Sequence, residues 1–167
     1  MTASPTPSAQ SHSLLRLTLM GFLAAIISAL IAASTLLALS DYQFYNTPHV
    51  GQVTGSVLQN YAEDLPSALV AAFLWYIPVG TFIFPPLAKL IGTGTGALRL
   101  LKFAVLAALV WFLVGEAIYL ALSPVAPAPP GVQTQDLITA ALSGVLFAVI
   151  YDLLLRRRDY LLGQRPQ

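Results

Sequence analysis

The stretch LTLMGFLAAIISALIAASTLLAL, residues 17–39, decides the fold, because its 23 residues include no charged side chain. A helix of about 20 apolar residues crosses the hydrocarbon core of a bilayer. Three similar runs follow, at residues 65–84, 100–122 and 137–155. The run at 100–122 contains a carboxylic acid, Glu116, among apolar neighbours. The pattern predicts four transmembrane helices.

The composition supports the membrane class. Of the 167 residues, 57% are apolar and 9% are charged, and the mean hydropathy is +0.76. A soluble domain carries about 25% charged residues, so this chain has too few to cover a water-facing surface. We therefore predict an all-α fold, an integral membrane four-helix bundle surrounded by the lipid bilayer. The net charge of +1 gives no reason to expect nucleic acid as a partner.

The basic residues predict how the helices are oriented in the membrane. All eight lie on one side of the predicted topology: Arg16, Lys89, Arg99, Lys102, Arg156, Arg157, Arg158 and Arg165. The connections at 40–64 and 123–136 contain acidic residues but no lysine or arginine. Since basic loops stay on the cytoplasmic side, we expect both termini to be cytoplasmic. The whole pattern is typical of small four-helix proteins of a bacterial inner membrane.

A single transmembrane domain is expected between two short tails. Residues 1–13 are small, polar and proline-containing, which predicts a disordered cytoplasmic tail. The helical domain spans residues 14–158, and residues 159–167 form a second cytoplasmic tail. A cleaved signal peptide is the alternative for residues 17–39, but their apolar run is longer than the usual length of about 7–15 residues.

The longest polar connection, residues 40–64, has two interpretations. Its aromatic residues lie close to the predicted helix ends, and aromatic rings favour the headgroup level of a membrane. The connection is therefore expected to lie along the membrane surface. The alternative is a loop that binds a partner.

Prolines mark the run at 65–84. Pro78 removes a backbone hydrogen bond and crowds the preceding turn, so it predicts a kink. The adjacent Pro85 and Pro86 are expected to end this helix.

Small residues at four-residue spacing predict where the helices pack against each other, because close backbone approach drives helix association in lipid. The first run contains an unbroken series of them, and the fourth contains a shorter one. These residues are Gly21, Ala25, Ala29 and Ala33, followed by Ala140, Gly144 and Ala148. The same stripes could dock against a larger membrane complex.

Glu116 is the main candidate for a functional side chain, because charge at bilayer depth is costly and needs protein or water around it. At a rise of about 1.5 Å per residue, Glu116 lies about 10 Å inside the membrane. Hydroxyls at the same depth are its expected partners, with one tyrosine three residues further on: Ser34, Thr35, Thr139, Ser143 and Tyr119. A hydrogen-bonded structural acid is favoured, with a partner contact or proton and ion handling as alternatives.

Asp152 lies four residues before Arg156, a spacing typical of an ion pair on one helix. Arg157 and Arg158 follow, and the four residues together are interpreted as a cytoplasmic anchor. The arginine cluster could also attract anionic lipid headgroups.

The chain lacks the residue patterns of the common enzyme classes. It contains no cysteine, which excludes disulfides, thiolate metal sites and cysteine nucleophiles. The GTGTG stretch at 92–96 is not followed by the lysine and hydroxyl residue of a phosphate-binding loop. His12 and His49 have no second ligand at metal-binding spacing. We therefore expect no cofactor, no metal and no catalytic site.

These observations favour a non-catalytic protein, an accessory, assembly or stabilising subunit that packs against a larger membrane protein complex. A small transporter or channel with Glu116 in a proton or ion path is the first alternative. An immunity-type membrane protein that shields the cell from a membrane-active toxin is the second.

Overall fold

The computed structural model describes residues 14–46, 57–91, 96–122 and 132–163, all of which are helical. The elements are α1 (Leu14–Asn46), α2 (Val57–Pro78), the π-helix η1 (Val79–Ile83), α3 (Phe84–Ile91), α4 (Gly96–Leu122) and α5 (Val132–Gly163). Within these ranges, four helical segments are long and apolar enough to cross a membrane: α1, the continuous α2–η1–α3 segment, α4 and α5. This confirms the all-α class and indicates a multi-pass membrane protein.

The helices extend beyond the apolar runs from which they were predicted. α1 continues to Asn46 and α5 continues to Gly163, so residues 159–163 of the expected tail are helical. A helix satisfies its own backbone hydrogen bonds, so it does not have to end where the apolar sequence ends. The expected tail at 1–13 and the centres of the two long connections, 47–56 and 123–131, lie outside the described residues.

The expectation that Pro85 and Pro86 end the second membrane helix is wrong. After Pro78 the chain forms the π-helical turn η1, in which the N–H of Phe84 donates to the carbonyl of Val79. This turn places both prolines in the first turn of α3, where backbone N–H groups need no partner within the new helix. The helix therefore continues to Ile91.

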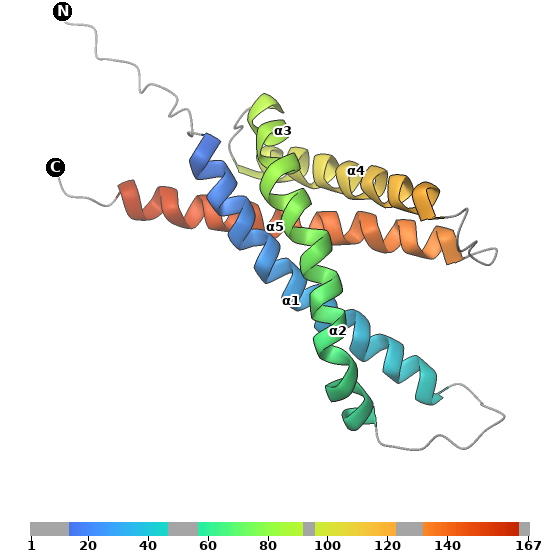
Figure 1. The fold of residues 1–167 in the computed structure, drawn as a ribbon. Helices are drawn as coiled ribbons and strands as arrows, with labels where there is room; N and C mark the ends of the chain where they lie inside the picture. Colours follow the sequence, from blue (N-terminus) through green and yellow to red (C-terminus); the bar gives the residue numbers. More distant parts are fainter. Residues whose placement is uncertain (1–13, 47–56, 92–95, 123–131, 164–167) are drawn as a thin grey trace, which may run out of the picture.

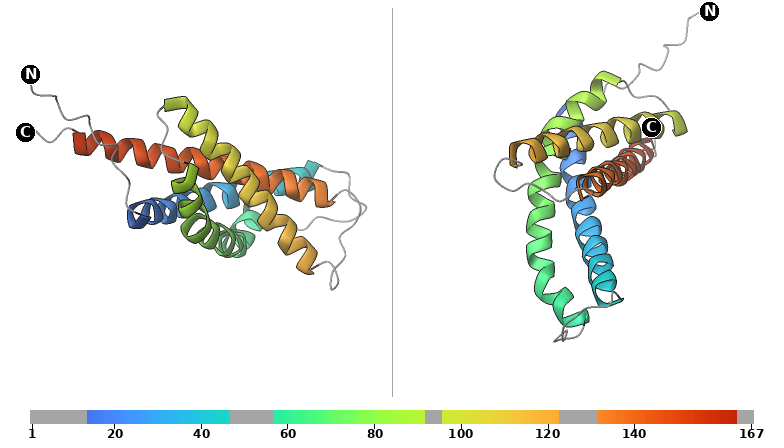
Figure 2. Two further views of the ribbon diagram at one scale, coloured as in Figure 1. Left: turned by 90° about the horizontal axis from the view of Figure 1, so that it is seen from above. Right: turned by 90° about the vertical axis from the view of Figure 1, so that its right-hand side faces the viewer.

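Two antiparallel hairpins build the fold, α1 with α2 and α4 with α5 (Figure 1). The hairpins cross each other instead of lying side by side, as the two views of Figure 2 show. α1 lies at the crossing and contacts α2, η1, α3 and α5. The start of α1, the start of α4 and the end of α5 converge, whereas the opposite ends of the two hairpins lie apart (Figure 1).

The crossing divides the molecule into two halves. We call residues 14–33, 76–91, 96–111 and 140–157 the closed half, and residues 34–46, 57–75, 112–122 and 132–139 the splayed half. Every buried side chain among the described residues lies in the closed half. The described lysines and arginines also lie there, on the ends of the helices that converge.

Aromatic rings fill the centre of the closed half. Phe84 of α3 contacts the rings of Phe147 and Tyr151 of α5, with centroids 5.0 and 5.2 Å apart. It also lies 5.9 Å from Phe103 and 6.4 Å from Trp111, both on α4. All these contacts have edge-to-face geometry, which is favourable between aromatic rings. Phe84 therefore joins the second membrane helix to the α4–α5 hairpin.

Glycines allow the closest helix contacts. A Cβ atom on Gly21 would collide with the carbonyl oxygen of Gly80, where α1 crosses η1. A Cβ atom on Gly144 would collide with the backbone of Ala107, where α5 packs against α4. These two backbone contacts set how deeply the helices of each pair approach each other.

Candidate functional site

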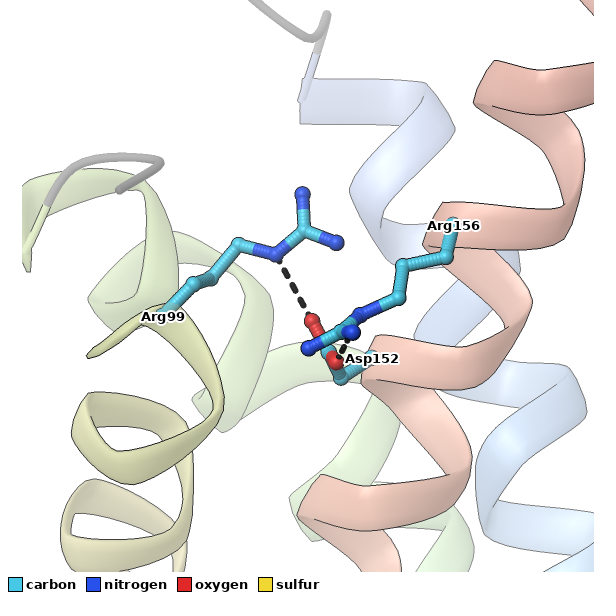
Figure 3. A network of polar contacts seen from close by, with 3 residues as sticks. All are labelled: Arg99, Asp152 and Arg156. Carbon is cyan, nitrogen blue, oxygen red and sulfur yellow. Dashed lines mark hydrogen bonds and ion pairs between the residues drawn. The ribbon is translucent and has the colours of Figure 1, made fainter. Parts of the chain in front are cut away.

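Asp152 of α5 is a buried carboxylate with two arginine partners (Figure 3). The Nε of Arg99 on α4 donates to Oδ1 at 2.7 Å, and the Nε of Arg156 donates to Oδ2 at 2.6 Å. The side chains of Arg99 and Asp152 are 10% and 2% exposed, whereas that of Arg156 is 44% exposed. We call these three residues the arginine–aspartate network. It ties α4 to α5 and extends from the core to the surface.

The contact between Arg99 and Asp152 follows from the register of the hairpin. Gly144 lies against Ala107, which sets the alignment of the two antiparallel helices. Arg99 lies eight residues before Ala107, and Asp152 lies eight residues after Gly144. The two side chains therefore face each other across the hairpin. Reasoning from the sequence found Arg156 as a partner but missed Arg99, because the helix register was unknown.

A second polar contact fixes α1 beside this network. The hydroxyl of Tyr151, the residue before Asp152, donates to the carbonyl of Leu17 at 3.4 Å. Both residues are buried. Of the remaining anchor residues, Arg157 is exposed, and the side chain of Arg158 lies outside the described part of the chain.

Glu116 lies in the splayed half, on a face of α4 that points away from α5. Ala107, which contacts α5 at Gly144, lies nine residues before Glu116, or about two and a half turns, and so on the opposite face. Large apolar side chains share the face of Glu116 at helical spacing, and their exposed fractions range from 38% to 61%. They are Val105, Leu109, Phe112, Leu113 and Leu120. We call this surface the Glu116 face.

One carboxyl oxygen of Glu116 is shielded, and the residue as a whole is half-buried. Its Oε2 atom is buried and has no hydrogen-bond partner within the described residues. None of the hydroxyls expected as partners is bonded to this oxygen within the described residues. Thr35 is exposed, whereas Ser34, Thr139 and Ser143 are half-buried. The side chain of Tyr119 lies outside the described part of the chain.

The crossing of the hairpins explains why these hydroxyls and Glu116 do not meet. Equal depth along two helices brings side chains together only when the helices run side by side. α1 diverges from α4 in the splayed half (Figure 1). α5 does accompany α4, but Glu116 lies on the face of α4 that is turned away from it.

The small residues named from the sequence lie at helix contacts of the closed half. All four members of the α1 series are buried, and so are the three members of the α5 series: Gly21, Ala25, Ala29, Ala33, Ala140, Gly144 and Ala148. They are covered by the chain's own helices, so they are not an open surface for another protein.

Four more buried polar atoms lie among the helices of the closed half without a hydrogen-bond partner in the described structure. They are Ser28 Oγ, Tyr76 Oη, Thr81 Oγ1 and Trp111 Nε1. The rings of Tyr76 and Trp111 lie 5.8 Å apart. Unpartnered buried polar groups are rare in proteins. Among the described residues, neither Ser28 Oγ nor Thr81 Oγ1 is hydrogen-bonded to a general base.

The described residues also contain no group of three or more histidine, aspartate or glutamate side chains that could hold a metal ion. No protein-family model, curated protein or solved structure matches this chain.

Proposed function

We propose that this chain is a non-catalytic, multi-pass membrane protein that packs against another integral membrane protein through the Glu116 face. The partner helix presents a hydrogen-bond donor or a basic side chain to Glu116. The chain then acts as an accessory, assembly or stabilising subunit of a larger membrane complex.

The position of Glu116 is the observation that carries this proposal. An exposed apolar face needs no protein partner in a bilayer, because lipid tails solvate it as well as a leucine side chain does. A carboxyl group on such a face is different, because burying a polar group without a hydrogen bond costs several kcal/mol, roughly 2–7. In our proposal, a polar group of a second membrane protein removes that cost when the side chain of Glu116 turns toward it.

The same position favours partner contact over transport. A proton or ion path through the chain needs its titratable group among interior polar atoms. Glu116 lies instead on the far side of α4 from α5, away from the buried hydroxyls of Ser28 and Thr81. The third hypothesis, toxin immunity, has no supporting feature among the described residues.

We propose further that the basic end of the closed half faces the cytoplasm of a bacterium and that the chain resides in the inner membrane. The basic residues at the converging helix ends support this orientation. Both termini are then cytoplasmic, and Glu116 lies toward the outer side of the membrane.

Photo-crosslinking in native membranes tests the proposal. p-Benzoylphenylalanine replaces Phe112, which lies one turn from Glu116 on the same face, or Phe82, which is exposed on η1. We expect one discrete adduct from position 112 and none from position 82. The crosslinked peptide should belong to an apolar, membrane-length segment that carries a basic or hydrogen-bonding residue.

The dependence on Glu116 provides the control. Glu116→Leu should abolish the adduct at position 112, because the added apolar side chain no longer requires a polar partner. An adduct that persists in Glu116→Leu, or equal adducts at positions 112 and 82, would contradict the proposal.

A further inference from the structure

The converging helix ends carry a large excess of positive charge. Among the described side chains of the closed half, Asp152 is the only carboxylate, and it is shared between two guanidinium groups. The cations of this half are Arg16, Lys89, Arg99, Lys102, Arg156 and Arg157. Arg158 and Asp159, next in the sequence, add one charge of each sign and leave the excess unchanged. The described side chains of the closed half therefore carry a net positive charge, which attracts anions.

The network lies where phospholipid headgroups would be. The apolar segment of α4 begins at Ala97, two residues before Arg99, and that of α5 ends at Arg157. Arg99 is held by the core, whereas Arg156 reaches the surface, where Arg157 and Lys102 are also exposed. The positive charge therefore spans the depth between the core and the membrane surface.

We propose that the arginine–aspartate network, with the exposed Arg157 beside it, binds the phosphate group of an anionic phospholipid. Guanidinium groups form strong, charge-assisted hydrogen bonds with phosphate oxygens and bind them in preference to neutral groups. The acyl chains of the same lipid would lie along the exposed apolar side chains of the α4–α5 hairpin, such as Leu101 and Leu153. An anionic lipid fits both the positive charge and the exposed apolar side chains, whereas a soluble phosphate fits only the positive charge.

Arg99 has a specific part in this site. Without it, Asp152 and Arg156 form a neutral pair. Arg99 provides the additional positive charge from a second helix and fixes the position of Asp152 through the contact at 2.7 Å. The bound lipid would then join α4 and α5 at the membrane surface.

Native mass spectrometry of the purified chain in detergent tests the proposal, with phosphatidylglycerol and phosphatidylcholine as the two probe lipids. A nearby Lys or Arg contributes about 1 kcal/mol toward an anionic lipid, so we expect the first phosphatidylglycerol to bind at least about five-fold more tightly than phosphatidylcholine. Arg156→Gln and Arg157→Gln should each reduce this preference, whereas Arg156→Lys, which keeps the charge, should retain most of it.

Lys89→Gln is the matched control. It removes one positive charge from the same end of the molecule, but from α3, which packs against α1, η1 and α4. The preference for phosphatidylglycerol should be unchanged in this variant. An equal loss from Lys89→Gln and Arg157→Gln would mean that net charge alone attracts the lipid, and this would overturn the assigned site.

Inorganic phosphate, added at constant ionic strength, distinguishes a lipid from a soluble anion. We expect it to leave phosphatidylglycerol bound, because it lacks acyl chains. Displacement of the lipid by inorganic phosphate, or equal affinities of the unmodified chain for the two lipids, would overturn the proposal. The comparison of the two lipids uses the unmodified chain, so it decides the question even if Arg156→Gln fails to fold.

Discussion

The closed and splayed halves of this molecule use the same kinds of residue in opposite ways. In the closed half, an aromatic cluster joins the two hairpins, and two glycine contacts and a carboxylate with two arginine partners hold the helices together within each hairpin. In the splayed half, the described side chains are exposed or half-buried, and the Oε2 of Glu116 has no partner among them. Two acids on neighbouring helices thus have different surroundings, Asp152 within the fold and Glu116 on its outer face.

This difference indicates which half of the molecule stabilises the fold and which half is available for association with another molecule. Removing one partner of a buried ion pair destabilises the fold, because the other charge stays buried. An acid on an open face contributes little to its own fold and leaves a polar group for another molecule to satisfy. The comparison predicts that substitutions in the closed half change stability and that substitutions on the Glu116 face change association.

The largest effect is expected for Asp152→Ala. Removal of the carboxylate breaks the buried ion pair of Arg99 with Asp152, which should reduce the free energy of unfolding in detergent by about 3–5 kcal/mol. The double variant Asp152→Leu with Arg99→Met should recover most of this loss, because it removes the buried charge together with its partner. A double variant as unstable as Asp152→Ala would show that the cost does not come from an uncompensated charge.

Gly144→Ala should have the next largest effect. Its Cβ would collide with the backbone of Ala107, so α4 and α5 must separate, and overpacking of this kind costs about 1–3 kcal/mol. Ala38→Leu is the counterpart in the splayed half, where the side chain is exposed, and it should leave the unfolding free energy unchanged. Equal losses from the two variants would contradict the division into two halves.

Two buried tyrosines of the closed half allow a comparison between a hydroxyl with a hydrogen-bond partner and a hydroxyl without one. Tyr151→Phe removes a hydrogen bond to Leu17 and should reduce the unfolding free energy by about 0.5–1.5 kcal/mol. Tyr76→Phe removes a buried hydroxyl that has no partner in the described structure, so it should leave stability unchanged or raise it. Thermal unfolding of the two variants in the same detergent measures the difference, and equal destabilisation would count against the assigned contacts.

The smallest change in stability is expected for Glu116→Gln in the isolated chain. This acid has no partner to lose within the described residues, so its unfolding free energy should change by less than about 0.5 kcal/mol. A loss comparable to that of Asp152→Ala would break the comparison, because it would place Glu116 in a stabilising contact of the fold.

Local sequence patterns predicted some features of this fold, and others depended on how the helices meet. The four apolar runs predict four membrane-length helices, and the four-residue spacing of Asp152 and Arg156 predicts their contact. The partnership of Asp152 with Arg99 depends on the register between α4 and α5, which a single helix does not reveal.

Two further features lay beyond sequence reasoning for physical reasons. In the π-helical turn η1, the N–H of Phe84 donates to the carbonyl of Val79, and the helix continues through Pro85. The usual rule that proline ends a helix does not consider such a turn. The hydroxyls assigned to Glu116 were chosen by depth alone, which assumes helices that run side by side. The face of Glu116 could have been identified from the bulky residues at helical spacing before it, such as Leu109 and Phe112.

The size of the complex in native membranes is the most direct test of the role of the Glu116 face. A tagged chain is solubilised in mild detergent, purified and sized, alongside Glu116→Leu and Leu142→Phe, a change at an exposed residue of α5. The unmodified chain and Leu142→Phe should elute with a second integral membrane protein in a fixed ratio, and Glu116→Leu should elute alone while remaining helical. An unmodified chain that elutes alone, or a Glu116→Leu variant that keeps the same partner in the same ratio, would contradict that role.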